Sequence, residues 1–439
     1  MSGPPEDAAA AAHFSDQARA AGLALPTARR FSPRIAAAAI VVIVAASLAV
    51  GYSTNWMSVN HAAPDPLSDL PGCAQGVALT VATEDGASAS LGAMFPALAM
   101  AFSHASGGCL SVASTGSPAG YASLAGLQEA SLVGPLVPMG SSGGALAATT
   151  DDVPLMVSPV VVIVNDQGLP RELNLSASAL AGAYLGSTTS WADPVFTAVN
   201  PGLHSTLSIT PVHPSGPSAA TDVFSMYLSQ WNGTFQAAIG PGSNVSWPVG
   251  PSASSPQDLT ALVASTPGAI GFEPTDVCPT LPSGVICAAV ETGGDEFVTA
   301  SAASVGAAAS TEANSSAALN GSWEDVTGVA PTGSTAYPMI ETTYAILYRD
   351  LGTAYGPLLS MNDSKWLIGL IFWIASNTNG AAAGIGVGYG YFGLAGHLAL
   401  MAAEETLNVT YDGNWILLPP GALDEGYDTG PDGGSTDEF

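Results

Sequence analysis

Segments rich in β-branched residues alternate with segments of helical periodicity along most of this chain, and this alternation limits the folds open to it. The predicted strands are 77–83, 109–115, 155–165 and 340–350. The predicted helices are 90–105, 121–128, 223–231 and 364–376. Strands that alternate with helices are typical of parallel α/β construction, and a length of 439 residues leaves room for two or three domains or lobes.

An apolar run at residues 35–51 precedes this α/β region. Its 17 residues are at the short end of what can span a bilayer. Four arginines (Arg19, Arg29, Arg30 and Arg34) lie on its N-terminal side, so the positive-inside rule predicts a single transmembrane helix at 35–52. The chain is therefore expected in the cell membrane, with its N-terminus inside and its main domain extracellular. The alternative is a cleaved signal peptide, with residues 47–49 as the cleavage site.

The charge balance excludes one class of partner. There are 35 acidic and 7 basic residues, and the net charge is −28. A chain this poor in Lys and Arg cannot neutralise a phosphate backbone, so nucleic acid is not expected as a partner. A domain with few basic groups also avoids a large positive charge when its carboxylates are protonated, which leads to the hypothesis of an acidic exterior, as for a protein of an acidophile.

Sequons and cysteines both lie beyond the apolar run. Seven N-x-[ST] sequons predict a glycoprotein, and they begin at Asn174, Asn232, Asn244, Asn314, Asn320, Asn362 and Asn408. The four cysteines are Cys73, Cys109, Cys278 and Cys287. An even number in an oxidising compartment indicates two disulfides, and no C-x-x-C pair points to a zinc or redox site.

Two motif matches do not carry a function. Residues 140–144 match G-x-S-x-G, but no strand leads directly into them. Residues 388–393 match G-x-G-x-x-G without a preceding strand or a following acidic residue at the required distance. The histidines form no metal-binding pair, so we expect no enzyme activity, no metal and no cofactor. The uncharged stretch 380–402 is predicted to be a loop and a helix outside the membrane.

Three Ser/Gly loops stand where strands lead into helices, at residues 84–90, 114–120 and 213–222. Unpaired N–H groups and the positive end of the helix dipole make such a loop suited to bind an anion. An ordinary capped helix is the alternative for each loop taken alone.

Residues 175–203 ("LSASALAGAYLGSTTSWADPVFTAVNPGL") resemble a characteristic stretch of the phosphate-binding proteins of phosphate ABC transporters. Residues 245–250, 265–274 and 337–350 are similar to later segments of that family, in the same order. The resemblance covers about 73–415. It implies a two-lobed type II periplasmic-binding-protein fold with two hinge crossings, which closes on an anion.

The resemblance also implies ligand-binding residues. Ser117 and Ser218 correspond to ligand serines of the family, and Ser88 or Ser90 would stand in for its threonine. Several positions depart from the family pattern. The ligand arginine falls on Pro214, an aspartate on Gly216, a threonine on Ala220, and a second aspartate on Pro135 or Leu136.

One histidine could replace part of the lost charge. His213 lies beside Pro214, and acidic conditions would make its side chain positively charged. A carboxyl group at Glu84 or Asp85 could accept or donate a proton to the ligand. A surface histidine without this role is the alternative for His213.

The same resemblance implies the disulfide pairs Cys73–Cys109 and Cys278–Cys287. It also implies the division of the chain. The expected segments are a cytoplasmic tail at 1–34, the anchor at 35–52, a linker at 53–72, lobe I at 73–158 and 339–419, lobe II at 159–338, and an acidic tail at 420–439.

Together these inferences predict an extracellular solute-binding protein. It would capture phosphate or a related small oxyanion between two lobes and deliver it to an ABC transporter permease. The alternative is a degenerate family member that acts as a glycosylated cell-surface interaction or envelope protein without a ligand.

Overall fold

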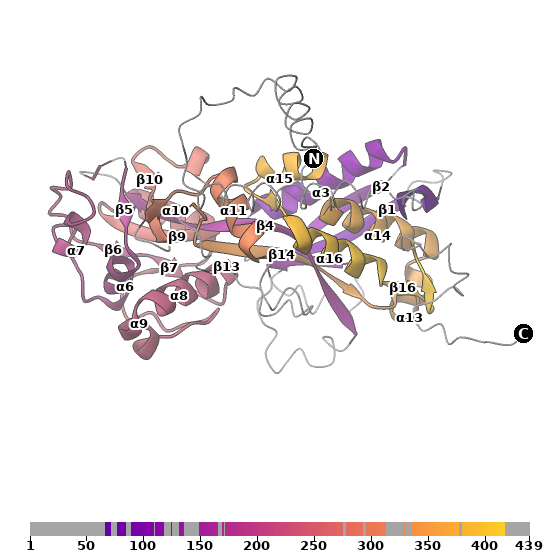
Figure 1. Ribbon diagram of the computed structural model, residues 1–439. Coiled ribbons are helices and arrows are strands. Elements are labelled where there is room, and N and C mark those ends of the chain that lie inside the picture. Colours follow the sequence, from indigo (N-terminus) through magenta and orange to yellow (C-terminus); the bar gives the residue numbers. More distant parts are fainter. Residues whose placement is uncertain are drawn as a thin grey trace, which may run out of the picture. The chain divides into compact units, whose positions relative to one another are not determined.

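The computed structural model describes residues 66–71, 77–84, 89–108, 110–117, 124, 131–135, 149–165, 169–170, 172–274, 278–292, 296–312, 328–329, 335–376 and 380–417. All of them belong to one compact unit, Pro64–Phe439. In this unit two sheets share one long strand, β4 (Thr150–Asn165) (Figure 1).

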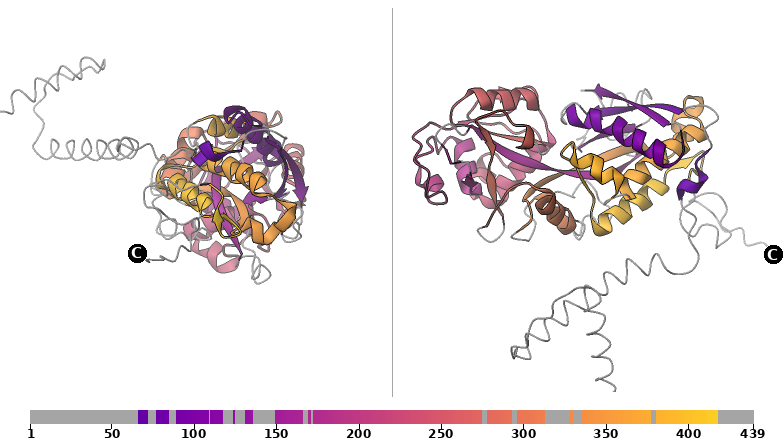
Figure 2. Two further views of the ribbon diagram at one scale, coloured as in Figure 1. Left: turned by 90° about the vertical axis from the view of Figure 1, so that its right-hand side faces the viewer. Right: turned by 90° about the horizontal axis from the view of Figure 1, so that it is seen from above.

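The first sheet and its helices form the part that we call lobe I (Figure 2). Its strand order is β2 (Leu110–Ser117), β1 (Val77–Glu84), β3 (Ser131–Pro135), β14 (Met339–Tyr348) and β4, with β13 (Gly328–Val329) on β14 and β15 (Phe392–Gly393) on β4. β1 is parallel to β2 and β3, whereas β14 is antiparallel to β3 and β4. The helices that pack here are α3 (Ala89–Ala105), α14 (Met361–Ser376), α15 (Ala381–Val387) and α16 (Gly396–Leu407).

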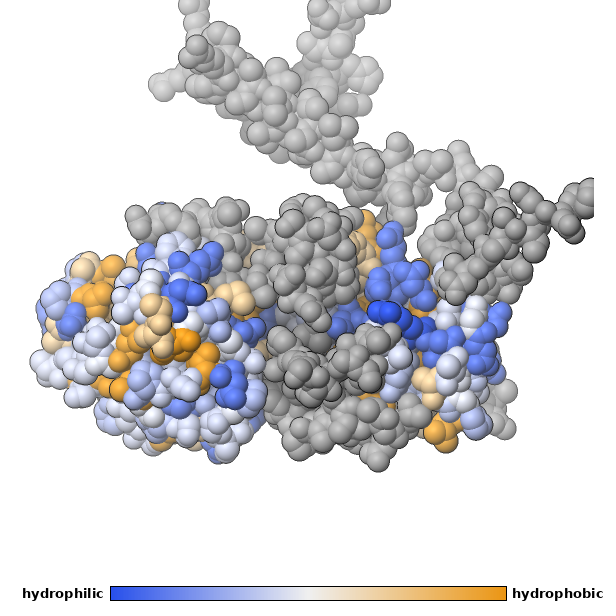
Figure 3. Space-filling model, turned by 90° about the horizontal axis from the view of Figure 1, so that it is seen from below, coloured by the Kyte–Doolittle hydropathy of each residue, from blue (hydrophilic) through white to orange (hydrophobic). Residues whose placement is uncertain are grey.

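The second sheet and its neighbours form lobe II. β4 continues into this sheet beside β9 (Ala269–Pro274) and β10 (Val285–Cys287), and β6 (Thr210–Pro211) pairs with β9. The other strands are β5 (Asn174–Leu175), β7 (His213–Pro214), β8 (Ser252–Ala253), β11 (Ala289–Thr292) and β12 (Glu296–Val298). The helices are α6 (Ala177–Leu185), α7 (Pro194–Thr197), α8 (Ala219–Trp231), α9 (Gly233–Ala238), α10 (Pro256–Ser265) and the 3-10 helix η3 (Cys278–Thr280). α11 (Ala302–Glu312) packs on β4 and on β13, β14 and β15 of the first sheet. Figure 3 shows an apolar area on the face of this lobe seen from below.

β4 changes partners in its middle. It pairs with β14 from Thr150 to Pro159 and with β9 from Val160 to Val164. Every residue from Val153 to Asn165 is buried, as expected of a strand that is covered on both faces. The predicted lobe boundaries, 158/159 and 338/339, stay predictions. The partner change of β4 lies between Pro159 and Val160, and β14 begins at Met339.

Most of the predicted elements are present with small shifts at their ends. The predicted strand 155–165 begins five residues earlier, at Thr150, and the predicted helix 364–376 begins at Met361. The antiparallel direction of β14 differs from the purely parallel sheet that the pattern suggests, because periodicity carries no information on strand direction. The 3-10 helix η1 (Pro66–Asp69) lies within the predicted linker, and its Leu67 packs against the core.

The stretch 380–402 contains two short helices, α15 and the first part of α16, one more than predicted. Among the described residues, no helix has both the length and the apolar character needed to cross a bilayer. The predicted anchor at 35–52, both tails and the motif at 140–144 lie outside the described residues.

The Cys278–Cys287 disulfide is confirmed, and it closes the loop between η3 and β10. Cys287 pairs in register with Ile163 of β4, so this covalent link lies at the edge of the second sheet. Cys73 and Cys109 lie outside the described residues, and their pairing stays a prediction.

Asp350 organises the end of β14. Its carboxylate accepts hydrogen bonds from the N–H groups of Thr353, Asp412 and Gly413 and from the Thr410 hydroxyl. Burial alone would raise the pKa of Asp350, but these hydrogen bonds outweigh it and lower the pKa to about 2. One carboxylate thereby joins α13 (Leu351–Tyr355) to the hairpin of β16 (Thr410–Tyr411) and β17 (Asn414–Trp415).

Gly250 is expected to tolerate no side chain. Its φ is +96°, and a Cβ atom there would lie 2.0 Å from the Pro211 carbonyl oxygen. We expect Gly250→Ala to lower the free energy of unfolding by about 2 kcal/mol or more, because strain and a backbone clash add. Urea denaturation measures this.

Gly202→Ala is the matched control, because a Cβ at Gly202 would meet no atom within 4 Å. Equal denaturation midpoints for the two variants would contradict the placement of Gly250 against Pro211.

Candidate functional site

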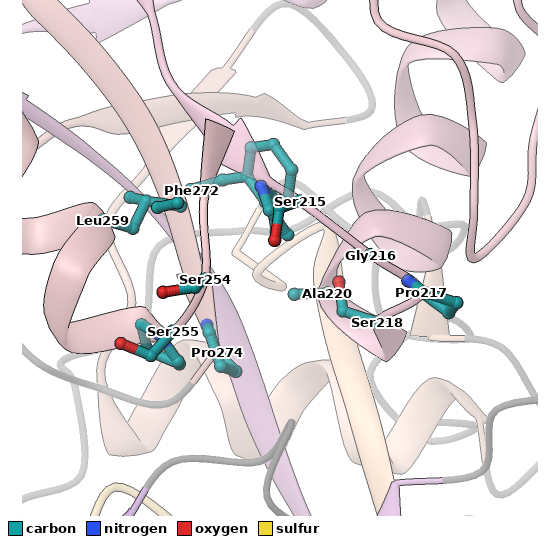
Figure 4. Close-up of a pocket in the computed structure, with 13 residues that line it drawn as sticks. Ser215, Gly216, Pro217, Ser218, Ala220, Ser254, Ser255, Leu259, Phe272 and Pro274 are labelled. Atoms are coloured by element: carbon teal, nitrogen blue, oxygen red, sulfur yellow. The ribbon is translucent and has the colours of Figure 1, made fainter. Parts of the chain in front are cut away.

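A pocket of about 150 Å³ opens in lobe II between the first turns of α8 and α10 (Figure 4). Its walls are Pro214, Ser215, Gly216, Pro217, Ser218, Ala220, Ala253, Ser254, Ser255, Pro256, Leu259, Phe272 and Pro274. The parallel pairing of β7 with β8 brings the two walls together, since His213 lies opposite Ser252 and Pro214 opposite Ala253.

Ser218 is the N-cap of α8. Its Oγ accepts a hydrogen bond from the Thr221 N–H at 3.0 Å and donates to Thr221 Oγ1 at 2.8 Å. Its backbone is extended, with φ of −154°, as is usual for an N-cap residue. The loop predicted from 213–222 is therefore a helix start on the pocket wall, with its unpaired N–H groups near the cavity.

Ser255 is the N-cap of α10, on the opposite wall. Its Oγ accepts from the Asp258 N–H at 3.1 Å, and the neighbouring Ser254 donates its hydroxyl to Asp258 Oδ2. Pro256 occupies the first helical position, where its missing N–H costs the helix nothing. In Figure 4 the hydroxyls of Ser254 and Ser255 turn toward α10, whereas Ser215 and Ser218 stand on the α8 side.

Aromatic packing fixes the floor of the pocket. Phe272 of β9 stacks on Phe224 of α8, with ring centroids 4.2 Å apart and planes 16° apart. The Tyr184 ring lies edge-on to Phe224, and its hydroxyl donates to the Val212 carbonyl at 3.0 Å. These contacts bind β9, α8 and α6 into one core, so both helix starts are held in place.

Three carboxyl groups surround the pocket without lining it. Hydrogen bonds from Ser254 and Ser255 lower the pKa of the exposed Asp258. Burial raises the pKa of Asp222, in the first turn of α8. Burial also raises the pKa of Glu273 to about 8, against a hydrogen bond from Thr260 that lowers it. Glu273 is therefore largely protonated at neutral pH.

The predicted site residues are brought together only in part. Ser218 lines the pocket. His213 does not: its ring stacks on Trp247 at 5.7 Å, and its Nδ1 lies 2.9 Å from the Pro214 carbonyl oxygen. Ser117 is the last residue of β2 and Ser90 is the second residue of α3, while Ser88 lies outside the described residues.

The lobe I loops begin at a common sheet edge. Glu84 ends β1 directly opposite Ser117 in the parallel register with β2. Ligands of open α/β sheets bind at the carboxyl ends of strands, which is where these two residues lie. Asp85 and the rest of the loop lie outside the described residues.

The α10 side of the pocket was not predicted. Ser255 followed by Pro256 is a sequence signal for a helix start, so the N-cap itself could have been found. Its position opposite α8 depends on the pairing of β7 with β8, which the sequence does not reveal. In the described part of the chain, no cluster of His, Cys, Asp or Glu is placed to hold a metal ion.

Four positions carried over from the family meet here. Pro214, Gly216, Ser218 and Ala220 stand where the family has an arginine, an aspartate, a serine and a threonine, and all four line the pocket. The pocket is therefore at the place where the family resemblance puts its third anion loop.

Comparisons with known proteins identify the family and the fold. A family model described as a PBP superfamily domain matches residues 77–378. The phosphate-binding protein PstS of Xylella fastidiosa is 28% identical over 220 residues, which are 48% of this chain and 57% of that protein. The chain thus spans little more than half the length of this curated relative. Phosphate-binding protein PstS 3 of Mycobacterium leprae is 32% identical over 125 residues, which are 28% of this chain and 32% of that protein.

A solved phosphate-binding protein from Stenotrophomonas maltophilia shares the fold. Its TM-score is 0.52 at 17% identity, over 74% of this chain and 93% of that one. The predicted type II α/β fold and the predicted family resemblance are confirmed.

Glu273 predicts a pH dependence of stability. Its folded pKa of about 8 lies above its ordinary value of 4.5, so the folded state holds a proton that the unfolded state loses between these pH values. The free energy of unfolding should therefore fall as the pH rises from 5 to 8. Glu273→Gln should remove about 3 kcal/mol of this fall, since it carries no proton to lose.

Chemical denaturation at pH 5 and pH 8 measures the effect, with Glu404→Gln on the exposed side of α16 as the control. If Glu273→Gln and wild type lose the same free energy over this range, Glu273 is not the buried acid described above.

Proposed function

The chain belongs to the PBP superfamily, and we propose that it is an extracellular solute-binding protein that captures phosphate or a related oxyanion between two lobes for an ABC importer. The observation that carries the proposal is the pocket where Pro214, Gly216, Ser218 and Ala220 meet. The relatives named above are phosphate-binding proteins, which supports phosphate as the first ligand to test.

The proposed mechanism is capture without chemical change. The first turn of α8 is the positive end of the helix dipole and lies at the pocket. Its N–H groups would donate hydrogen bonds to oxygen atoms of the anion. The Ser215 and Ser218 side chains lie on the same wall. Closure of lobe I, with Ser117 and Ser90 on its loops, would then exclude water and present the loaded protein to the permease.

The proposed location is the outer face of the cell membrane. The apolar segment 35–52 would anchor the chain, and the sequons would carry glycans on the outside. Asn244, Asn362 and Asn408 are exposed, as a glycan requires. Asn174 is half-buried and donates its Nδ2 to the Val199 carbonyl at 3.3 Å, and Asn232 caps α9, so these two are poorer acceptors.

An acidic exterior is part of the proposal. The buried Glu273 is neutral at low pH, and Asp350 keeps its charge down to a pH of about 2. The raised pKa of Glu273 favours the folded state in acid, whereas the stabilisation from Asp350 is lost as the pH falls from about 4 to about 2. A domain poor in Lys and Arg gains little repulsion in acid.

A ligand-free surface protein is the second candidate. It is favoured by one observation: three of the four family positions in the pocket hold Pro214, Gly216 and Ala220, which bring no polar side chain. Ligand binding separates the two functions, because only a solute-binding protein needs a working pocket.

Isothermal calorimetry of the full chain, in mild detergent, with phosphate, sulfate and molybdate at pH 3 and pH 7 tests the proposal. We expect phosphate to bind, and Ser218→Ala to weaken it about tenfold through loss of a hydrogen-bonding oxygen and the cap. Ser176→Ala is the matched control, since it removes the N-cap of α6, away from the pocket.

Equal phosphate binding by the Ser218→Ala variant and wild type would place the anion elsewhere. Absence of heat with every anion at both pH values would favour the ligand-free surface protein.

A further inference from the structure

The walls of the lobe II pocket carry no ionisable side chain. Its thirteen lining residues are serines, prolines, alanines, one glycine, one leucine and one phenylalanine. Resting on the proposed function, we infer that the site takes its oxyanion in a protonated form with at most one negative charge, which for phosphate is the dihydrogen form. The composition of the walls and the charges around the pocket favour this form over the dianion.

None of the described residues of lobe II is a lysine or an arginine. The sequence has no lysine or arginine from Glu172 to Tyr348. Arg349 follows the far end of β14 and binds Asp151 at 2.7 Å. Since a strand rises about 3.3 Å per residue, Arg349 lies about 30 Å along β14 from Met339.

Two other basic groups, Lys365 and His213, also bring no positive charge into the pocket. Lys365 lies on α14, which packs in lobe I. The His213 ring stacks on Trp247, while the next residue, Pro214, lines the pocket. Successive side chains of a strand point to opposite sides, so the imidazole faces away from the cavity.

Several groups of the pocket wall have no proton to offer an anion. Pro214, Pro217, Pro256 and Pro274 have no N–H, and they are four of its thirteen wall residues. The hydroxyl protons of Ser218 and Ser254 go to Thr221 and Asp258. The N–H groups of Ser215 and Ser218 go to the carbonyl oxygens of Ala253 and Ser243.

The phosphate dianion near neutral pH, hydrogen phosphate, keeps one O–H donor. Dihydrogen phosphate brings two O–H donors of its own. Ser218 Oγ accepts one hydrogen bond, from the Thr221 N–H, and so keeps a lone pair that one of these protons can use. The first N–H groups of α8 remain for the ligand's other oxygens.

The charged groups around the pocket also favour the singly charged ligand over the dianion. The ionisable groups on the elements that pack here are Asp222 on α8, Asp258 on α10, Glu273 on β9, Glu341 on β14 and His213 on β7. Four of these five are acids. The buried Glu273 is largely protonated at neutral pH, and those acids that are ionised repel a doubly charged ligand more than a singly charged one.

Calorimetry of the full chain with potassium phosphate at pH 5 and pH 8 tests the inference, because phosphate loses its second proton near neutral pH. We expect phosphate to bind about tenfold more tightly at pH 5. Sulfate, which carries no proton at either pH, should bind more weakly than phosphate at pH 5.

Pro214→Arg provides a gain-of-function test, with Pro214→Gln as the uncharged comparator of similar length. A guanidinium in the pocket should tighten phosphate binding at pH 8 about tenfold relative to the glutamine variant and reduce the pH dependence. Circular dichroism checks that both variants fold, and the wild-type pH ratio tests the inference without them.

Phosphate binding that is equal or tighter at pH 8 in the wild type would overturn the inference and leave the proposed function standing. No phosphate binding at either pH would overturn the proposed function, and this inference with it. Tighter binding at pH 5 together with rescue by Pro214→Arg supports both.

Discussion

The backbone hydrogen bonding of one buried strand, β4, determines where everything else lies. A buried strand has to satisfy its N–H and C=O groups along its whole length, and β4 does so with β14 in one half and with β9 and β10 in the other. Because β9 carries Phe272 and Pro274, the floor of the pocket is placed by this pairing. The starts of α8 and α10 are then held against that floor by Phe224 and Leu259.

Features set by neighbouring residues in the chain could be predicted from the sequence, whereas features set by contacts between distant segments could not. β4 and α14 were predictable because long apolar segments leave a clear pattern. Ser218 was predictable because an N-cap is a local feature. The direction of β14, and the meeting of Ser255 with the α8 loop, depend on contacts between segments far apart in the chain, and no local pattern encodes them.

The pocket shows how a helix start can keep its place in a family while its chemistry changes. The first turn of α8 still presents its N–H groups, but proline, glycine and alanine replace the charged and polar partners of the family. In a chain with so few cations, the proposed selectivity would come from hydroxyl oxygens and from the ligand's own protons. Such a site would depend on ligand protonation more than on protein charge.

The order of the strands along the chain also bears on how the molecule assembles. The Glu341 carboxylate of β14 accepts a hydrogen bond from the Ser158 hydroxyl of β4, and these two residues are 183 positions apart in the chain. Lobe II is built from the intervening segment, so it can fold first and bring the two ends together, which shortens the loop that β14 must close. During synthesis, the edge of β3 that pairs with β14 would stay unpaired until the ribosome has synthesised β14. The order of the chain therefore allows lobe II to form before the first sheet is complete.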